Sequence, residues 1–482
     1  MKFPKKIAEL LLVVALLLPH LFLNIRHTQD WGDDFAMYLI EAKNIAEHKP
    51  VGETRHVSNP NVMLGPINYP IGYPLLISPL VKNGIDYYKL NLLQSVFLIV
   101  TLFFGFLFLR NYFSRTASIL MTLILAYNPS LMGFKIEVIS DIAFWMFLNI
   151  IILLVLKNRS ILGIILLAVL TGFSIHIRSI GYVLALGTIL FWLINDLRNK
   201  TLSTEIKKYT SYIVTLLIVF FGIKILYPVN SDYPFSGNRI TIDNIASQLS
   251  YNVATLGEYF KYYRVEDYYF IPLIFAAFFI SFLLLGFALE LKRNAFSFLN
   301  ILTVLSVGIV IVYPFGDAGY RLILPLIFVF SYYFIIGFGQ TLTKLELRGK
   351  TVVVIGAFIY MATYIKPNAE IHENGFKPVD GPVTIEFAQL LNFMNKNNIK
   401  HKMIGVDKSR ALALYSDNKF ASLSDSCFAK DITDLKLNYV ITHYSQTSDL
   451  KKQLADADTA RLKSIYNNAA FKMYEVRKTS NH

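Results

Sequence analysis

The sequence has few charged residues and almost no cysteine. Of its 482 residues, 16% are charged, whereas soluble domains average about 25%. The single cysteine, Cys427, has no second cysteine with which to form an intrachain disulfide. Instead, 54% of the residues are hydrophobic, and they gather in long runs over most of the chain. These features exclude a soluble enzyme, a disordered chain and a small domain held together by disulfides.

The long apolar runs predict an all-α polytopic membrane protein. A bilayer core of about 30 Å needs about 20 apolar residues per helix, and a helix pairs its own backbone polar groups there. About eleven segments have this character: 7–25, 89–110, 116–133, 139–157, 160–177, 179–195, 209–228, 269–291, 296–314, 320–341 and 351–365. The first is too long for a signal peptide, so we expect a retained helix. Only residues 176–179 separate the fifth and sixth segments, but together the two are much longer than one bilayer crossing, which favours a tight hairpin over one long helix.

Lysine and arginine are unevenly distributed among the loops, and this predicts the orientation. Cytoplasmic loops are rich in these residues. With the N-terminus in the cytoplasm, alternate loops carry pairs or groups of them, whereas the short loops on the other side hold mostly single ones, Lys135, Arg178 and Arg321. The sequence thus predicts a multi-pass membrane protein with its N-terminus in the cytoplasm. The excess of lysine and arginine in the loops on one side of the lipid bilayer accounts for much of the formal charge of +13. We therefore expect no nucleic-acid partner.

The predicted spans divide the chain into two domains. We expect a transmembrane domain over residues 1–365, with amphipathic juxtamembrane helices in a long external loop at 26–88. A middle loop at about 229–268 is also expected on the external side. Residues 366–482 are polar and predict a small, exported, soluble α/β domain, external or periplasmic if the number of spans is odd. Within it we expect a helix at about 383–397 and strands at 403–406, 439–442 and 471–474.

Two acidic residues stand at the start of the first external loop. Asp33 and Asp34 precede an amphipathic helix that extends to about residue 47. One interpretation is that they only stabilise the positive end of that helix. The second acidic group, Glu137 and Asp141, lies in the next external loop, where Ser140 or Asp141 could equally be a helix cap.

Basic residues occur at external helix ends as well. His176 and Arg178 lie at the turn between the fifth and sixth spans, and Arg321 lies at the start of the tenth. Either arginine could extend to lipid phosphates. Arginine also suits phosphate groups, because its planar guanidinium donates two parallel hydrogen bonds. Carboxylates and arginines on one side of a membrane fit a reaction in which an acceptor hydroxyl loses a proton and a lipid phosphate leaves.

This combination resembles the integral-membrane glycosyltransferases of the C-type superfamily, which use polyprenyl-phosphate sugars. The nearest groups are the aminoarabinose transferases and the protein O-mannosyltransferases. The resemblance covers residues 1–365 as architecture and the tail more loosely. One departure is aspartate in place of the usual glutamate at the second acidic position. The residues that carry the resemblance are Asp33, Asp34 and Tyr38, the Tyr-Pro-Ile-Gly-Tyr-Pro segment at 69–74, the acidic segment at 137–141, Arg178, and Arg321 to Pro325.

The resemblance implies an inverting sugar transfer from a polyprenyl-phosphate-linked donor to a lipid, glycan or protein acceptor. An anchored donor lipid and an external site imply the plasma (inner) membrane as the location. Asp33 would be the general base, with Asp34 as its catalytic partner. The donor phosphate would be bound by Arg178, Arg321 and His176. The acceptor or a divalent cation, Mg²⁺ or Mn²⁺, would be positioned by Glu137, Asp141 and Tyr38, and no metal is fixed by the sequence.

Two other classes of function stay open at this point. A secondary transporter or lipid flippase would need charged groups at mid-membrane and broken helices. The predicted spans carry few such charges, and Lys224 is the main exception. A scaffold that only presents the C-terminal domain would tolerate replacement of the acidic and basic residues.

Overall fold

The computed structural model divides the chain into two compact units. It describes residues 5–62, 68–157, 160–229, 241–258, 270–313, 320–344, 349–375, 380–424, 427–444 and 462–477. The first unit comprises the described residues within 1–25, 91–226 and 236–376, and the second comprises those within 26–90, 227–235 and 377–482. The contacts therefore group the first loop with the C-terminal region, whereas the sequence assigned that loop to the transmembrane domain. The functional division at residue 365 stays a prediction.

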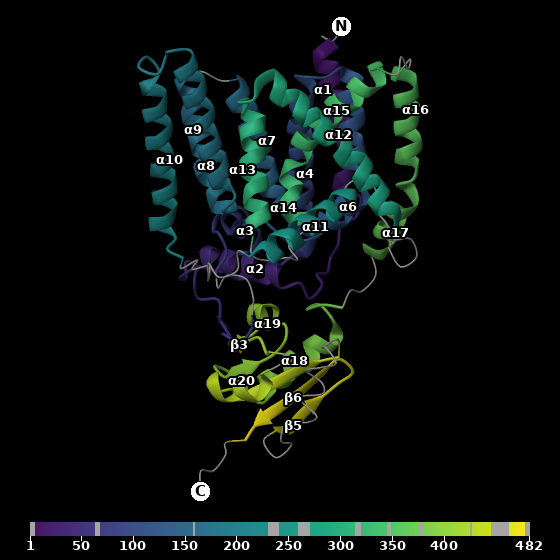
Figure 1. Cartoon of the computed structure of the whole chain (residues 1–482). Helices are drawn as coiled ribbons and strands as arrows, with labels where there is room; N and C mark the ends of the chain where they lie inside the picture. The colour runs from purple at the N-terminus through teal and green to yellow at the C-terminus, as the bar shows by residue number, and fades with distance from the viewer. Residues whose placement is uncertain are drawn as a thin grey trace. The chain divides into compact units, whose positions relative to one another are not determined.

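The first unit is helical, and its long helices run side by side (Figure 1). A helix lies over each predicted span. The helices are α1 (Lys5–Leu17), α4 (Tyr87–Arg110, whose first turn belongs to the second unit), α5 (Arg115–Ala126), α6 (Pro129–Phe134), α7 (Asp141–Lys157), α8 (Ile161–Ile177), α9 (Gly181–Arg198), α10 (Ile206–Leu226), α11 (Ile242–Glu258), α12 (Phe270–Asn294), α13 (Phe298–Val312), α14 (Tyr320–Ile323), α15 (Ile327–Lys344), α16 (Gly349–Ala362) and α17 (Ile365–Gly375). The predicted middle loop lies largely outside the described residues, α11 excepted.

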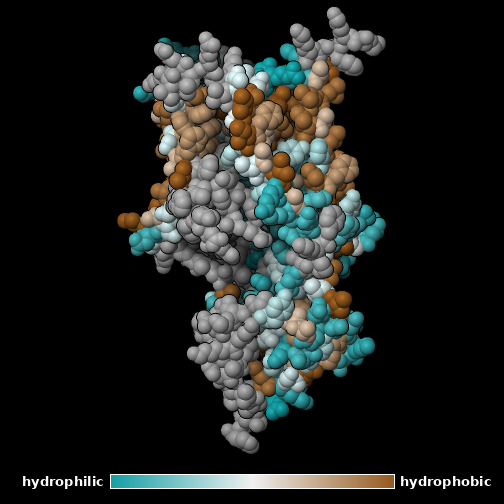
Figure 2. Space-filling model, turned by 90° about the vertical axis from the view of Figure 1, so that its right-hand side faces the viewer, coloured by the Kyte–Doolittle hydropathy of each residue, from teal (hydrophilic) through white to brown (hydrophobic). Residues whose placement is uncertain are grey.

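Four helical segments are long and apolar enough, by length and composition, to cross a membrane among the described residues. They are Tyr87–Arg110, Gly181–Arg198, Ile206–Leu226 and Arg321–Thr343. Only 11% of the most apolar window of α10 is buried inside the protein, and Ile218 and Ile225 on it are largely exposed. Hydrophobic side chains also cover much of the helical unit on the face shown in Figure 2. A soluble surface would not expose so much apolar area, so the protein is a multi-pass membrane protein. The number of eleven crossings stays a prediction.

Two local features shape the helix ends of this unit. The predicted third span divides into α5 and α6, because Pro129 cannot continue a helix and Asn128 caps the next one through Leu131 N–H. The predicted hairpin between α8 and α9 is confirmed. Gly181 begins α9, and a Cβ on it would lie 2.7 Å from the backbone nitrogen of Ile175. Only glycine permits this close turn, which presents Arg178 at the end of α8.

The second unit contains a six-stranded mixed sheet in the order β1-β3-β2-β4-β6-β5. The first four strands in this order are parallel neighbours, and β6 pairs antiparallel with both β4 and β5. The strands are β1 (His56–Val57), β2 (Met403–Gly405), β3 (Lys419–Ala421), β4 (Tyr439–His443), β5 (Leu462–Asn467) and β6 (Phe471–Val476). The three strands that the sequence predicts are β2, β4 and β6, and all three are confirmed.

Helices of the second unit come from both ends of the chain. The predicted amphipathic helices of the first loop are α2 (Asp33–Ala46) and α3 (Gly72–Val81), and they pack against each other. The C-terminal region contributes α18 (Ile385–Lys396), as predicted, with α19 (Ser409–Tyr415) and α20 (Phe428–Asp434). Helix α19 packs on α2. Strand β1 belongs to the first loop and pairs with β3 of the C-terminal region, so the two segments form one fold.

Candidate functional site

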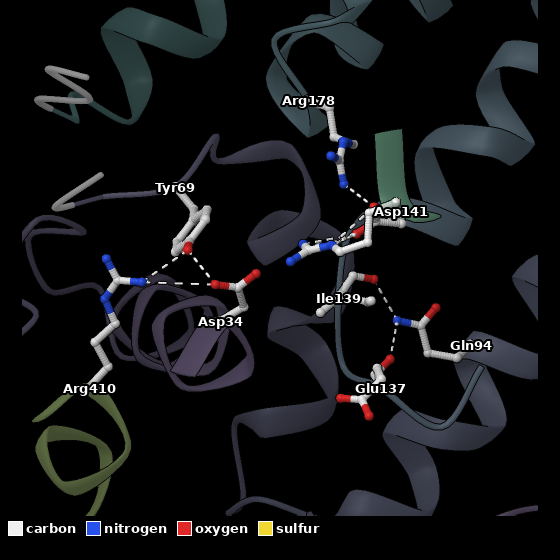
Figure 3. A network of polar contacts seen from close by, with 9 residues as sticks. Asp34, Tyr69, Gln94, Glu137, Ile139, Asp141, Arg178 and Arg410 are labelled. Carbon is white, nitrogen blue, oxygen red and sulfur yellow. Dashed lines mark hydrogen bonds and ion pairs between the residues drawn. The ribbon is translucent and has the colours of Figure 1, made fainter. Parts of the chain in front are cut away.

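Two arginines and one aspartate form an ion cluster in the helical unit (Figure 3). The side chain of Asp141 is fully buried. Arg178 forms an ion pair with Oδ1 of Asp141 through Nη1. Arg321 donates from Nη2 to Oδ2 of Asp141 at 3.1 Å, and its Nε lies 3.3 Å from the same oxygen. One carboxylate therefore orients two guanidinium groups.

Three separate helix ends bring this cluster together. Asp141 is the first residue of α7, and Arg178 follows the last residue of α8 with an extended backbone. Arg321 lies on the single turn of α14, which is followed by a 3-10 turn, Leu324–Leu326, that contains Pro325. This turn packs on α7. The Arg-x-x-x-Pro sequence thus interrupts the helix and sets the arginine beside the start of α7.

The cluster suits an anionic group. Among these three side chains, the positive charges exceed the negative charge by one. Two guanidiniums also bring more N–H donors than one carboxylate can accept. The Arg178 and Arg321 side chains retain exposures of 17% and 29%, so they are held by a buried anion while they reach the surface. This geometry is chemically able to bind a phosphate with charge-assisted hydrogen bonds.

Two residues that the sequence places near these arginines have other partners. His176 Nε2 lies 3.0 Å from the carbonyl oxygen of Phe220 on α10, and the two rings stack. The carbonyl oxygen of Glu137 accepts from Gln94 Nε2 at 3.2 Å, and Figure 3 shows the Glu137 carboxylate turned away from Asp141. The roles predicted for His176 and Glu137 stay predictions.

A second polar network surrounds Asp34 in the second unit (Figure 3). The hydroxyl of Tyr69 donates to Asp34 Oδ1 at 2.5 Å. Arg410, from α19, donates to the Tyr69 oxygen at 3.0 Å and lies 3.9 Å from Asp34 Oδ1. Burial and the neighbouring Asp34 charge raise the pKa of Tyr69 well above its usual range. Tyr69 therefore keeps its proton and is a donor to the carboxylate.

A buried carboxyl group, that of Glu41, also contacts this network through the backbone of Tyr69. Glu41 on α2 is 0% exposed, and its Oε1 accepts the backbone N–H of Tyr69 at 2.8 Å. Burial raises the pKa of Glu41 to about 8, although the Tyr69 N–H and the Arg410 charge oppose this. Tyr38, on the same helix, is buried against the rings of Tyr69 and Tyr73 at 4.7 and 4.9 Å. These residues of the first loop thus form one packed cluster.

The acidic pair occupies the first turn of α2. The residue that caps this helix is Gly32, and Asp33 is the first helical residue. The side chain of Asp33 lies outside the described part of the structure. Asp34, with a side-chain exposure of 28%, contacts Tyr69 and Arg410 rather than only the helix end. The simple interpretation as a helix-stabilising charge does not account for these partners.

A metal site does not emerge from the described side chains. Among them, no three acidic, histidine or cysteine residues gather closely enough to hold an ion. The carboxylates of Asp34 and Asp141 are each engaged by arginine. The side chain of Asp33 is not among those described, and the Mg²⁺ or Mn²⁺ that the resemblance leaves open stays a prediction.

Sequence reasoning missed three members of the second network. Arg410 and Glu41 were not among the predicted site residues, and Tyr69 entered only through the Tyr-Pro motif. For Arg410 there was a signal, because it is the only charged residue in the apolar segment from Ser409 to Tyr415. A charge in a buried apolar helix needs a partner. Its partner lies about 340 residues earlier in the chain, which no local pattern indicates.

Comparisons with known proteins identify the fold. Neither the models of protein families nor the curated protein sequences match this chain. Among solved structures, ArnT from Cupriavidus metallidurans bound to undecaprenyl phosphate is 10% identical, with a TM-score of 0.55 over 96% of this chain and 97% of that chain. The archaeal oligosaccharyltransferase AglB from Archaeoglobus fulgidus, in complex with an inhibitory peptide and a dolichol-phosphate, is 12% identical, with a TM-score of 0.56 over 91% and 69%.

A further structure of the Archaeoglobus fulgidus oligosaccharyltransferase, in complex with Zn and sulfate, has a TM-score of 0.58 at 12% identity and covers 97% of this chain and 73% of that chain. The chain therefore shares its fold with ArnT and with the archaeal oligosaccharyltransferase AglB, as the resemblance predicted. At these identities the comparison concerns the fold. The chemistry of this chain has to be argued from its own residues.

Proposed function

We propose that this protein transfers a sugar from a polyprenyl-phosphate-linked donor to an acceptor hydroxyl at the external face of the plasma membrane. The observation that carries the proposal is the cluster of Arg178, Asp141 and Arg321 at helix ends of this fold. It is supported by ArnT, whose structure was determined with undecaprenyl phosphate. The sequence grouped Asp141 with the acceptor, but its two arginine partners favour a role in holding the phosphate-binding groups.

The transfer is proposed to proceed in one displacement with inversion. The acceptor hydroxyl gives its proton to the carboxylate of Asp33, the general base, while its oxygen attacks the anomeric carbon. The bond from that carbon to the phosphate oxygen breaks, and the electron pair leaves with the polyprenyl phosphate. Arg178 and Arg321 stabilise the negative charge that develops on the phosphate.

Asp34 and Tyr38 of the first loop are proposed to bind the acceptor. Asp34 and Tyr38 lie with Asp33 on α2, and the described side chains of Asp34 and Tyr38 share the contact with Tyr69. Glu137 is proposed to help position the acceptor from the second loop. The acceptor is a lipid, a glycan or a protein, and the sugar is a hexose or pentose. The C-terminal region is proposed to lie on the same external side.

An assay of carrier release tests this function. Purified full-length protein is incubated in detergent with undecaprenyl-phosphate-linked sugars and a membrane extract as the source of acceptor. We expect release of undecaprenyl phosphate together with a new glycosidic bond. We also expect Asp33→Asn to lower the rate by about 10²–10⁴-fold. A folded Asp33→Asn variant with normal transfer would remove Asp33 from this role.

The same preparation separates transfer from transport. In proteoliposomes, a transporter or flippase would move labelled lipid-linked sugar across the bilayer and leave the sugar–phosphate bond intact. That result, with no carrier released in any donor incubation, would contradict the proposed function.

A further inference from the structure

A buried arginine of the C-terminal region lies at the acidic motif of the first loop. Arg410 is only 2% exposed, and its guanidinium carbon lies 5.5 Å from the centre of the Tyr69 ring. Its Nη1 donates to the Tyr69 oxygen at 3.0 Å and lies 3.9 Å from Asp34 Oδ1. Removing a guanidinium from water is costly unless charged and polar partners surround it. The partners of Arg410 shown here are the tyrosine and the aspartate of the first loop.

Buried polar side chains of the first loop and of the C-terminal region hold the residue next to Arg410, Ser409, in place. Ser409 Oγ lies 3.1 Å from His56 Nδ1 of the first loop and 2.7 Å from Ser422 Oγ of the C-terminal region. All three side chains belong to buried residues. His56 also lies on β1, which pairs with β3. Contacts with the sheet and with the first loop therefore fix the position of Ser409, the first residue of helix α19.

Tyr69 is the link between Arg410 and the carboxylate. Its hydroxyl donates to Asp34 at 2.5 Å, its backbone N–H donates to Glu41 and its ring packs on Tyr38. The hydroxyl has one proton, and donation to Asp34 leaves its lone pairs to accept from Arg410. The order Arg410 to Tyr69 to Asp34 is thus fixed by donor and acceptor chemistry, and Figure 3 shows the three groups pointing toward one another.

We infer that the C-terminal region completes the acceptor side of the site, with Arg410 as a positioning residue that acts through Tyr69 on Asp34. This inference rests on the proposed function and gives the C-terminal region a role in it. Arg410 does not itself have to touch the substrates. It holds the tyrosine hydroxyl, and the hydroxyl holds one oxygen of the carboxylate. Loss of either group removes a contact that orients the Asp34 carboxylate, and small displacements of a catalytic group can cost about 100-fold in rate.

A double-mutant cycle on the full-length protein tests this assignment. The variants are Arg410→Met, Arg410→Lys, Tyr69→Phe and the double variant Arg410→Met/Tyr69→Phe. Tyr69→Phe removes one oxygen and keeps the ring, so it tests the contact even if Arg410→Met fails to fold. The matched control is Arg55→Met. Arg55 also joins the first loop to the C-terminal region, through an exposed ion pair with Asp417 at 3.0 Å, but it lies outside the Asp34 network.

The measured quantities are the transfer rate at saturating donor and the Kd of undecaprenyl phosphate. We expect Arg410→Met and Tyr69→Phe each to lower the rate by about 10- to 100-fold, with the Kd unchanged. The double variant should be no slower than the single ones, because both disrupt one chain of contacts. Arg410→Lys should recover part of the rate, and Arg55→Met should behave like the wild type.

Two results would overturn the assignment. The first is a folded Tyr69→Phe protein with the wild-type rate. The second is a double variant whose loss equals the product of the two single losses, which would make the residues independent. A wild-type protein that transfers sugar from none of the donors is a different failure, because it overturns the proposed function itself and this assignment with it.

Discussion

At the scale of single residues, the two ion pairs of Asp141 indicate what this side chain does. Its carboxylate is fully buried, and two arginines from other helix ends bind it. A buried ion pair contributes little net stability, but removal of one partner leaves uncompensated charge. The cluster is thus better explained by the need to hold two guanidiniums in a fixed arrangement than by the stability of the fold.

We therefore expect Asp141→Asn to be strongly destabilising. The amide keeps the shape of the side chain but leaves two adjacent guanidiniums without their anion. The expected loss is about 3 kcal/mol of unfolding free energy, somewhat reduced because both arginines are partly exposed. Thermal unfolding in detergent measures it. Asp417→Asn, in an exposed ion pair, should change stability by less than about 1 kcal/mol. Equal midpoints for the two variants would contradict this interpretation.

Glu41 should make the stability of its unit depend on pH. Burial raises its pKa from the usual 4.5 to about 8. Between these values the unfolded chain has released the proton and the folded chain still holds it, so stability falls as pH rises from about 5 to 8. Each pKa unit corresponds to about 1.4 kcal/mol, which gives a loss of a few kcal/mol.

Thermal unfolding at pH 5 and pH 8 tests this dependence on Glu41. The Glu41→Gln variant lacks the titrating group, so its midpoint should fall less over this interval than that of the wild type. Glu53→Gln, at an exposed position of the same loop, should retain the wild-type dependence. Parallel shifts in all three proteins would show that Glu41 ionises without effect on folding.

At the scale of elements, the helices were predictable because an apolar run is a local signal. The broken third span was not, although Asn128 and Pro129 are visible in the sequence, because a proline in a membrane helix is often tolerated. Strands β2, β4 and β6 are hydrophobic and were expected. Strand β1 has only two residues and no periodicity, and it exists because β3 provides a parallel edge for it.

Helices α12 and α15 should depend on two glycines where they touch. A Cβ on Gly286 of α12 would lie 1.8 Å from the carbonyl oxygen of Tyr333. A Cβ on Gly337 of α15 would lie 2.0 Å from the carbonyl oxygen of Phe282. Small residues allow membrane helices to approach this closely. We expect Gly286→Ala and Gly337→Ala each to lower stability by about 1–3 kcal/mol.

Gly339, on the same helix α15, is the matched control. Nothing lies within 4 Å of the Cβ that an alanine would add there, so Gly339→Ala should leave thermal stability unchanged or slightly raise it. If Gly339→Ala and Gly337→Ala are equally stable, the two helices do not pack through these glycines.

At the scale of the whole molecule, the chain contains two units, and the candidate site residues of each unit come from distant segments. The sequence predicted the membrane architecture, the acidic motif and both arginines, because these features are carried by local runs and short motifs. It did not predict that the C-terminal region folds with the first loop, because this depends on many contacts between the two segments, among them the β1–β3 pairing, the packing of α19 on α2 and the contact of Arg410 with Tyr69. Those contacts join residues far apart in the chain.

The central claim is that Arg178 and Arg321, oriented by Asp141, bind the phosphate of a polyprenyl carrier. Equilibrium binding of undecaprenyl phosphate to the detergent-solubilised full-length protein tests it most directly, with Arg178→Met, Arg321→Met and the exposed Arg55→Met compared with the wild type. Because a hydrogen bond to a charged group contributes about 1.5–3 kcal/mol, each site variant should weaken binding by about tenfold or more. Arg55→Met should bind like the wild type. Undiminished binding by folded Arg178→Met and Arg321→Met proteins would contradict the claim.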